Sequence, residues 1–160
     1  MEHNELIRSE VLESVRHLSN EQLNKKVEEG SWTIMQVLDH LYLMEKTIVG
    51  TMTKVLAQGP EQPTDEKPIH LTPDRSRKVP APDYVDPSDE YMTLEEVKKK
   101  LHESREALHA FVAQHEEEEL KKKSFSHPVF GLLHLKQWCD FIGYHEKRHL
   151  EQIEELKAKL

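Results

Sequence analysis

The chain has 160 residues, of which 36% are hydrophobic and 32% are charged, with only five glycines. This balance is typical of helical proteins and poor for a β sandwich with many tight turns, so we expect an all-α fold with one domain over residues 1–160. Thirty acidic against 22 basic residues give a formal charge of −8. Such a chain repels phosphate backbones and anionic lipid headgroups, which argues against nucleic acid and membrane partners.

The cysteine usage and the N-terminal segment favour a cytoplasmic location. Cys139 has no second cysteine with which to form a disulfide, and its neighbours Trp138 and Phe141 indicate a small packed hydrophobic residue rather than a reactive nucleophile. The segment MEHNELIRSE lacks the basic and apolar parts of a secretion signal. No run approaches the roughly 18 apolar residues that span a bilayer. We therefore expect a cytoplasmic protein.

Hydrophobic spacing predicts a first helix over residues 5–18, which Ser19 and Asn20 interrupt. Its apolar stripe consists of Leu6, Ile7, Val11, Val15 and Leu18. A second helix is expected to start after Thr33, whose hydroxyl can cap it while Gln36 reaches back to complete a capping box. It ends at Gly59-Pro60. Its apolar stripe consists of Ile34, Val37, Leu38, Leu41, Ile48, Val55 and Leu56.

A third helix repeats this start signal, with Thr93 as the cap and Glu96 as its box partner. Its stripe consists of Leu94, Val97, Leu101, Leu108, Phe111 and Val112. The charged run from Glu116 to Lys123 follows, and we expect it to be a solvated helix end without a function of its own.

The last helix is predicted to begin near Leu133 or Leu135 and to run almost to Leu160, because it contains only a tolerated Gly143. Before the third helix, the linker 59–92 holds seven of the eight prolines and cannot be helical. So long a connection is unusual in a compact domain unless it is a functional lid or a crossover. A crossover lets the second and third helices of a four-helix bundle lie parallel. We therefore predict a four-helix bundle with a long proline-rich crossover.

Two of the eleven histidines fall on core-facing positions of the last helix. His145 and His149 continue the stripe of Trp138 and Ile142 at intervals of four and three, so both rings point inward one turn apart. Ring nitrogens so placed can converge on one ion at about 2.0–2.1 Å, and zinc, nickel or iron would accept them. The alternative is that each ring is a buried neutral imidazole bonded to backbone or carboxylate, which for a pair risks two desolvated polar groups.

The segment HEKRH, residues 145–149, matches the H-E-x-x-H signature of zinc proteases by chance. In the extended signature a glycine and a third histidine follow, but Gln152 and Glu155 stand at those positions. Glu146 lies about 100° around the helix from His145, so we expect it to face solvent or to support the ligands from outside rather than act as a general base. A third ligand must come from another helix.

The best candidate for that third ligand is His40, in SWTIMQVLDHLYLME. It stands three residues after Val37 and four before Met44, at the border of the apolar stripe, where it can face inward. Metal sites in helix bundles are built from side chains on facing helices, so this border histidine complements the pair on the last helix.

The segments SWTIMQVLDHLYLMEK and SHPVFGLLHLKQWCDFIGYHEKRHLEQI, with the linker DRSRKVPAPDYVDP between them, resemble the DinB/YfiT-like superfamily of metal-binding four-helix bundles. The likeness covers nearly the whole chain. It implies an up-down-down-up bundle with a long connection between helices two and three, and a three-histidine metal site formed by His40, His145 and His149. It also implies a homodimer formed through helix faces.

The resemblance implies an enzyme, because characterised members include metal-dependent transferases that use thiols such as bacillithiol or mycothiol, as well as isomerases, and others are named metal-dependent hydrolases. Three histidines leave coordination positions of a divalent ion open for water or substrate. We therefore expect a divalent-metal-dependent thiol S-transferase or hydrolase acting on a small molecule, with a low-molecular-weight thiol as a further cofactor. The rival is a non-catalytic bundle that binds a metal or small ligand as a dimeric module.

Some neighbouring side chains have two interpretations. Arg75, Arg77, His127 and Gln152 either line the pocket mouth, where they orient substrate carboxylates or support the ligands, or serve ordinary surface and capping roles. Trp32 is expected to anchor the start of the second helix by packing.

Overall fold

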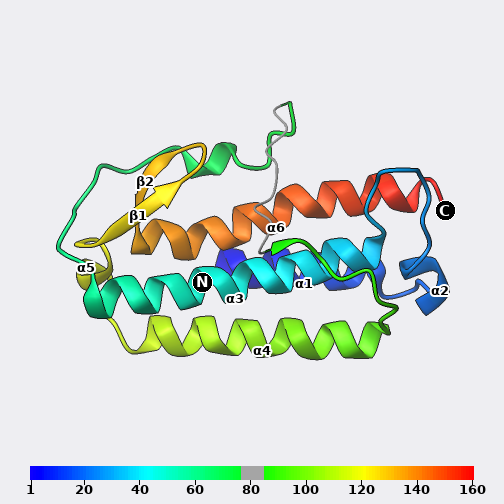
Figure 1. The fold of residues 1–160 in the computed structure, drawn as a ribbon, viewed down its shortest axis with the longest axis horizontal. Coiled ribbons are helices and arrows are strands. Elements are labelled where there is room, and N and C mark those ends of the chain that lie inside the picture. The colour runs from blue at the N-terminus through cyan, green and yellow to red at the C-terminus, as the bar shows by residue number, and fades with distance from the viewer. Residues whose placement is uncertain (77–84) are drawn as a thin grey trace.

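The computed structural model describes residues 1–76 and 85–160, which form a bundle of long helices (Figure 1). The long helices are α1 (Glu2–Val15), α3 (Ile34–Gln58), α4 (Leu94–Ala113) and α6 (Leu135–Lys157). Helices α1 and α6 run in one direction along the bundle and α3 and α4 in the other. The predicted up-down-down-up four-helix bundle is confirmed, with α1 packed against α6 and α3 against α4.

Shorter elements connect the long helices. They are α2 (Asn20–Leu23), the 3-10 helix η1 (Ile69–Leu71), α5 (Glu117–Leu120) and the strands β1 (Ser124–His127) and β2 (Gly131–His134). The strands pair antiparallel, with Ser124 opposite His134 and His127 opposite Gly131. The sequence predicts no strand, so this two-stranded hairpin is an addition to the predicted all-α fold.

The hairpin sets the start of the last helix. Gly131 adopts a left-handed φ of 73° after a three-residue loop, a conformation that favours glycine. Strand β2 ends at His134, whose Nδ1 accepts a hydrogen bond from the Gln137 backbone N–H at 3.1 Å and so caps α6. The last helix therefore begins at Leu135, the later of the two predicted starts.

Both predicted capping boxes are present. The Thr33 hydroxyl accepts a hydrogen bond from the Gln36 backbone N–H at 3.0 Å, and the Gln36 side chain accepts one from the Thr33 N–H at 2.9 Å. Thr93 and Glu96 make the same pair of bonds at 3.2 and 2.9 Å. These boxes satisfy orphan N–H groups at the starts of α3 and α4, which places both helices as the sequence predicts.

Two predicted boundaries shift. The first helix covers Glu2–Val15 rather than 5–18, and Leu6 is 57% exposed although it was placed on the buried stripe. Ile7, the next residue of the same predicted stripe, is 2% exposed, because neighbouring residues point about 100° apart around a helix. The charged run does not end α4, which stops at Ala113; its acidic residues form the first turn of α5, where the helix dipole favours them.

The core contains two apolar clusters at opposite ends of the bundle. One includes Ile7, Val11, Leu38, Leu41, Leu101 and Ile153, and the other includes Ile48, Met52, Leu108, Trp138, Cys139 and Ile142. Cys139 is 2% exposed, and burial raises the pKa of its thiol to about 12, which confirms the prediction of a packed hydrophobic residue. Buried polar side chains such as His40, Glu45, Arg105 and His145 lie among these apolar residues on the long helices.

The described parts of the crossover, residues 59–76 and 85–92, contact both α6 and α3. The Arg148 guanidinium donates a hydrogen bond to the carbonyl of Thr72 at 2.9 Å on the α6 side. The Ser88 backbone N–H donates to the carboxylate of Asp39 at 3.0 Å on the α3 side. The described parts of the crossover therefore lie against the two helices that carry the three predicted ligands. No helix among residues 1–76 and 85–160 has the length and apolar character to cross a membrane.

Candidate metal centre

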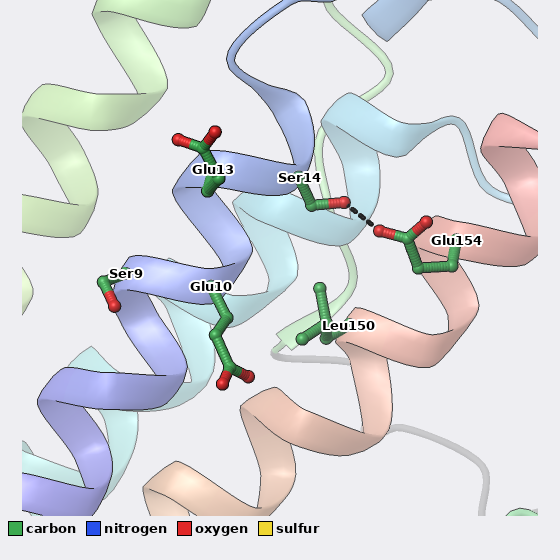
Figure 2. A pocket seen from close by; sticks show the side chains of 6 residues that line it. All are labelled: Ser9, Glu10, Glu13, Ser14, Leu150 and Glu154. Atoms are coloured by element: carbon green, nitrogen blue, oxygen red, sulfur yellow. Dashed lines mark hydrogen bonds between the residues drawn. The ribbon is translucent and has the colours of Figure 1, made fainter.

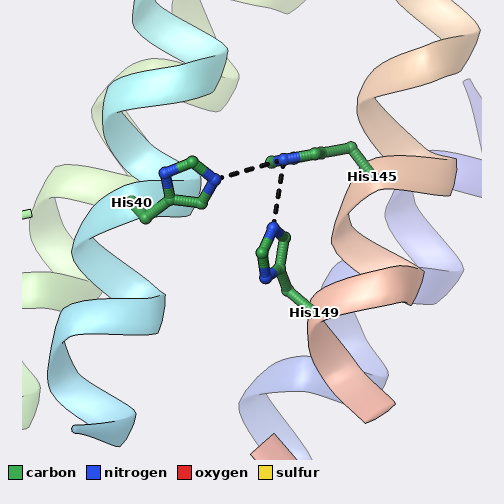
Figure 3. Close-up of side chains that lie close together, drawn as sticks. All are labelled: His40, His145 and His149. Carbon is green, nitrogen blue, oxygen red and sulfur yellow. Dashed lines mark hydrogen bonds between the residues drawn. The ribbon is translucent and has the colours of Figure 1, made fainter. Parts of the chain in front are cut away.

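The three predicted histidines meet in the middle of the bundle. His40 extends from α3, and His145 and His149 extend from successive turns of α6 (Figure 3). The Nε2 atom of His145 lies 3.2 Å from Nε2 of His40 and 3.2 Å from Nε2 of His149. One ring nitrogen from each residue lies within 4.8 Å of the others. The structure thus brings together residues that are more than 100 positions apart in the chain.

Hydrogen bonds at the far side of two rings decide which nitrogen faces the site. Nδ1 of His40 lies 2.9 Å from the carbonyl of Val85, and Nδ1 of His149 lies 2.7 Å from the side-chain oxygen of Gln152. Both partners accept hydrogen bonds, so each Nδ1 carries the hydrogen and each Nε2 presents a lone pair. Nε2 of His145 can donate a hydrogen bond to only one of these two lone pairs. A cation among the rings would interact with both of them.

Burial keeps the three rings neutral, which is the form that binds metals. His40 is 1% exposed and His145 7% exposed. Burial lowers the pKa of His40, and it lowers that of His145 well below its usual range. It also lowers the pKa of His149 to about 3, with smaller contributions from His40 and from the guanidinium groups of Arg148 and Arg75.

Two separations between the ring nitrogens fit the ligand spacing of a first-row divalent ion. Metal–nitrogen bonds of about 2.0–2.1 Å separate neighbouring ligand nitrogens by roughly 2.9–3.4 Å when the bond angles lie between octahedral and tetrahedral values. The Nε2 separations from His145 to His40 and from His145 to His149, both 3.2 Å, fall inside that interval. The three-histidine group could therefore hold a metal ion.

Aromatic side chains border the histidines. The ring centroid of Trp32 lies 5.0 Å from that of His40 and 6.4 Å from that of His149. Phe141 lies 5.6 Å from His145 by the same measure. Trp32 also packs against the first apolar cluster, which agrees with its predicted anchoring role. These rings give the site an apolar border, in which electrostatic interactions are stronger than in water.

The neighbouring residues singled out from the sequence have different surroundings. Gln152 supports a ligand directly through its bond to His149. Arg75 forms an ion pair with Glu155 at 2.8 Å, and its side chain is 31% exposed. Arg77 lies outside the described residues. The proposed roles at the pocket mouth thus receive structural support only for Gln152, as a residue that orients a ligand.

His127 belongs to the hairpin. Its Nδ1 accepts a hydrogen bond from the Val129 backbone N–H at 3.0 Å, which stabilises the turn. Its ring packs against Trp138 and Phe141, with centroid distances of 5.4 and 4.7 Å, and burial lowers its pKa to about 4. Phe141 contacts both His127 and His145, so His127 is one aromatic ring removed from the candidate site.

Of the two roles expected for Glu146, facing solvent or supporting the ligands from outside, the structure excludes the first. Its side chain is 2% exposed and accepts a hydrogen bond from the Arg8 Nε at 2.9 Å. Burial raises the pKa of Glu146, although the guanidinium groups of Arg8 and Arg105 act in the opposite direction. Glu146 points away from the ligand rings, towards α1 and α4, because it lies about 100° around α6 from His145.

A surface hollow lies away from the histidines. It has a volume of about 490 Å³ and opens between α1 and α6 (Figure 2). Its lining consists of Ser9, Glu10, Glu13, Ser14, Leu150 and Glu154. These side chains include no metal-binding histidine, and three acids make the hollow unfavourable for anionic ligands.

Known proteins share this chain's sequence pattern and fold. The family model described as the DinB superfamily matches residues 3–153. The uncharacterized protein YuaE of Bacillus subtilis (strain 168) is 37% identical over 153 residues, which cover 96% of this chain and 94% of YuaE. The crystal structure of TT2238, a four-helix bundle protein, aligns with a TM-score of 0.67 at 23% identity, over 96% of this chain and 94% of that one. The family match covers nearly the whole chain, and the bundle carries three inward histidines. This chain therefore belongs to the DinB superfamily.

Proposed function

We propose that His40, His145 and His149 hold one divalent ion, zinc, nickel or iron, and that the protein is a metal-dependent enzyme acting on a small molecule. The observation that carries this proposal is the convergence of three neutral rings: Nε2 of His145 lies 3.2 Å from Nε2 of each of the other two histidines, and one ring nitrogen from each residue lies within 4.8 Å of the others. A three-ligand set leaves coordination positions open, unlike the closed four-ligand sets of structural zinc sites. Membership of the DinB superfamily supports the same reading.

The reaction that we favour is transfer of a low-molecular-weight thiol of the bacillithiol type, with hydrolysis as the second candidate. When bound, a divalent ion lowers the pKa of a coordinated thiol or water towards neutrality. In the transfer reaction the thiol sulfur forms a bond to an electrophilic carbon, the leaving group departs with its electron pair, and the thiol proton goes to solvent.

The chain's own residues would prepare the site for this chemistry. Val85 and Gln152 orient His40 and His149 so that their Nε2 lone pairs face inward. Trp32 and Phe141 border the rings with apolar surface and limit the access of bulk water. We further propose a cytoplasmic homodimer, in keeping with the single cysteine and the resemblance described above.

Metal content tests the first part of the proposal. Protein purified without added metal should contain about one equivalent of a first-row ion, and His149→Ala should reduce this to roughly a tenth or less because it removes one of three ligands. The far-UV circular dichroism of the variant should stay helical. His102→Ala, at an exposed position on α4, is the matched control and should retain the metal. Wild-type protein that contains no ion and takes up none would contradict the proposal.

Thiol consumption tests the reaction. Metal-loaded protein should accelerate the loss of a low-molecular-weight thiol in the presence of chlorodinitrobenzene or a bimane reagent, and His149→Ala should not. Ester and amide substrates test the hydrolase candidate with the same pair of proteins. Stoichiometric metal without turnover of thiols, esters or amides would instead favour the non-catalytic binding module.

A further inference from the structure

Four buried charged side chains, one from each long helix, form a network in the middle of the bundle. We call Arg8, Glu45, Arg105 and Glu146 the quartet; they come from α1, α3, α4 and α6 in that order. Their exposed fractions are 7%, 1%, 4% and 2%. Two guanidinium groups and two carboxylates balance in charge, which is the usual condition for burying ions.

Each arginine bridges the same two carboxylates. Arg8 donates from Nη2 to Glu45 at 3.0 Å and from Nε to Glu146 at 2.9 Å. Arg105 donates from Nε to Glu45 at 2.7 Å and from Nη2 to Glu146 at 3.5 Å. The two glutamates lie on α3 and α6, so two planar guanidinium groups from the other two helices tie α3 to α6.

Helices α3 and α6 are also the helices that carry the three histidines. Glu146 follows His145 directly in the chain, and Glu45 lies five residues after His40, about 7.5 Å along the helix axis. A ligand set must be held within about 0.5 Å of its productive geometry. The quartet thus fixes the spacing and register of α3 and α6 within about two helical turns of the three histidines, whose geometry has to meet that tolerance.

Stability alone is a weak explanation for the quartet. Well-packed apolar residues of similar volume often stabilise a protein as well as a buried ion network does, because ions lose their hydration on burial. What apolar side chains do not provide is direction: a planar guanidinium donates along fixed vectors, so it holds two carboxylates in one arrangement.

We propose that the quartet is the positioning network of the metal site: it holds α3 against α6 so that His40 meets His145 and His149. The quartet touches neither the ion nor the substrate, and it acts through the helices that present the ligands. This inference rests on the proposed metal centre and adds to it the residues that set the ligand geometry.

The test replaces the whole quartet at once. The variant R8M/E45M/R105M/E146M leaves no unpaired buried charge, so it should fold with wild-type helical content. We expect its zinc affinity, measured by competition with a chromophoric chelator, to be about 10–100-fold weaker than that of the wild type, the loss typical of removing the partners that orient ligands. The visible absorption of the cobalt-loaded variant should also differ in intensity or band position, because it reports ligand geometry.

Two controls separate positioning from stability. Arg16→Met removes an exposed arginine that follows the last residue of α1 and pairs with Glu13, and it should change neither the affinity nor the cobalt spectrum. Val97→Ala weakens the core of α4 without touching the quartet, and should lower the melting temperature while keeping both metal readouts. If the fourfold variant does not fold, R8K/R105K, which keeps the charges but loses the planar forks, takes its place with the same expectation.

The outcomes are distinct. A folded quartet variant with wild-type zinc affinity and cobalt spectrum would overturn the positioning role and leave the metal centre intact. Wild-type protein that binds neither zinc nor cobalt would overturn both. Weakened affinity and an altered spectrum in the quartet variant, with both controls unchanged, would establish the role proposed here.

Discussion

At His149, one neighbouring side chain decides which face of the imidazole is available. Gln152 lies one turn further along α6, and its side-chain oxygen accepts the Nδ1 hydrogen at 2.7 Å. His40 achieves the same result with a backbone carbonyl, that of Val85. Removing one acceptor should therefore free one ring to rotate or to change tautomer, and metal affinity should measure the effect.

Gln152→Ala is expected to weaken zinc binding by about 10–100-fold, because the ring of His149 loses the partner that fixes its tautomer. Gln152→Glu keeps an acceptor oxygen in place and should bind zinc at least as tightly as the wild type, since a carboxylate makes the imidazole a more basic ligand. Competition titrations with a chelator measure both. Equal affinity in all three proteins would show that Gln152 does not orient the ligand.

At the scale of elements, α1 and α6 are in close contact at Gly143. A Cβ atom at this position would lie 2.2 Å from Oδ1 of Asn4 and 2.9 Å from the ring of His3. Asn4 cannot move aside cheaply, because its amide donates a hydrogen bond to the carbonyl of Cys139 at 2.9 Å in a buried position. Glycine inside a helix normally costs stability, so the close contact of two helices is the physical reason for it here.

Gly143→Ala should lower the free energy of unfolding by about 1–3 kcal/mol, since overpacking outweighs the gain in helix propensity. Gly50→Ala is the matched control: Gly50 is exposed on α3, and a Cβ there meets nothing within 4 Å. That variant should be more stable than the wild type by roughly 0.5–1 kcal/mol. Urea denaturation measures both changes, and a stabilised Gly143→Ala would contradict the packing argument.

For the molecule as a whole, metal binding and folding should be linked. The three histidines come from two helices that are separated by the crossover, so the site exists only in the folded chain. An ion that binds only the native state stabilises it according to its concentration.

Zinc at about 100 times its dissociation constant should add roughly 2.7 kcal/mol, which for a chain of this size raises the melting temperature by about 5–10 °C. A chelator should reverse the shift. His40→Ala should show little or none, because only the pair on α6 remains. A wild-type melting curve that is insensitive to zinc and chelator would argue against a native-state site.

Much of this architecture could be predicted because it depends on local signals. Thr33 and Thr93 start helices through side-chain bonds to residues three positions on, and the prolines of the crossover exclude a helix. The three histidines could be found from helical periodicity and the resemblance together. The hairpin was missed because its four-residue strands are too short for periodicity to reveal.

Other parts of the site left weaker signals. Glu45 lies four residues after Leu41 and three before Ile48, and Arg105 stands in the same relation to Leu101 and Leu108. A charged residue at stripe spacing is a sign of burial, but its partners on other helices cannot be identified from one sequence. The role of the Val85 carbonyl cannot be predicted from the sequence, since every residue has a backbone carbonyl.

The crossover also separates the histidines and the quartet into two groups along the chain. A cut within it would yield one fragment with α1–α3 and another with α4–α6. The first would hold His40, Arg8 and Glu45, and the second would hold the remaining two histidines, Arg105 and Glu146. Each fragment would then carry one arginine and one glutamate of the quartet, and neither fragment would contain all three histidines. Such halves should reassemble as a split protein whose complementation depends on zinc.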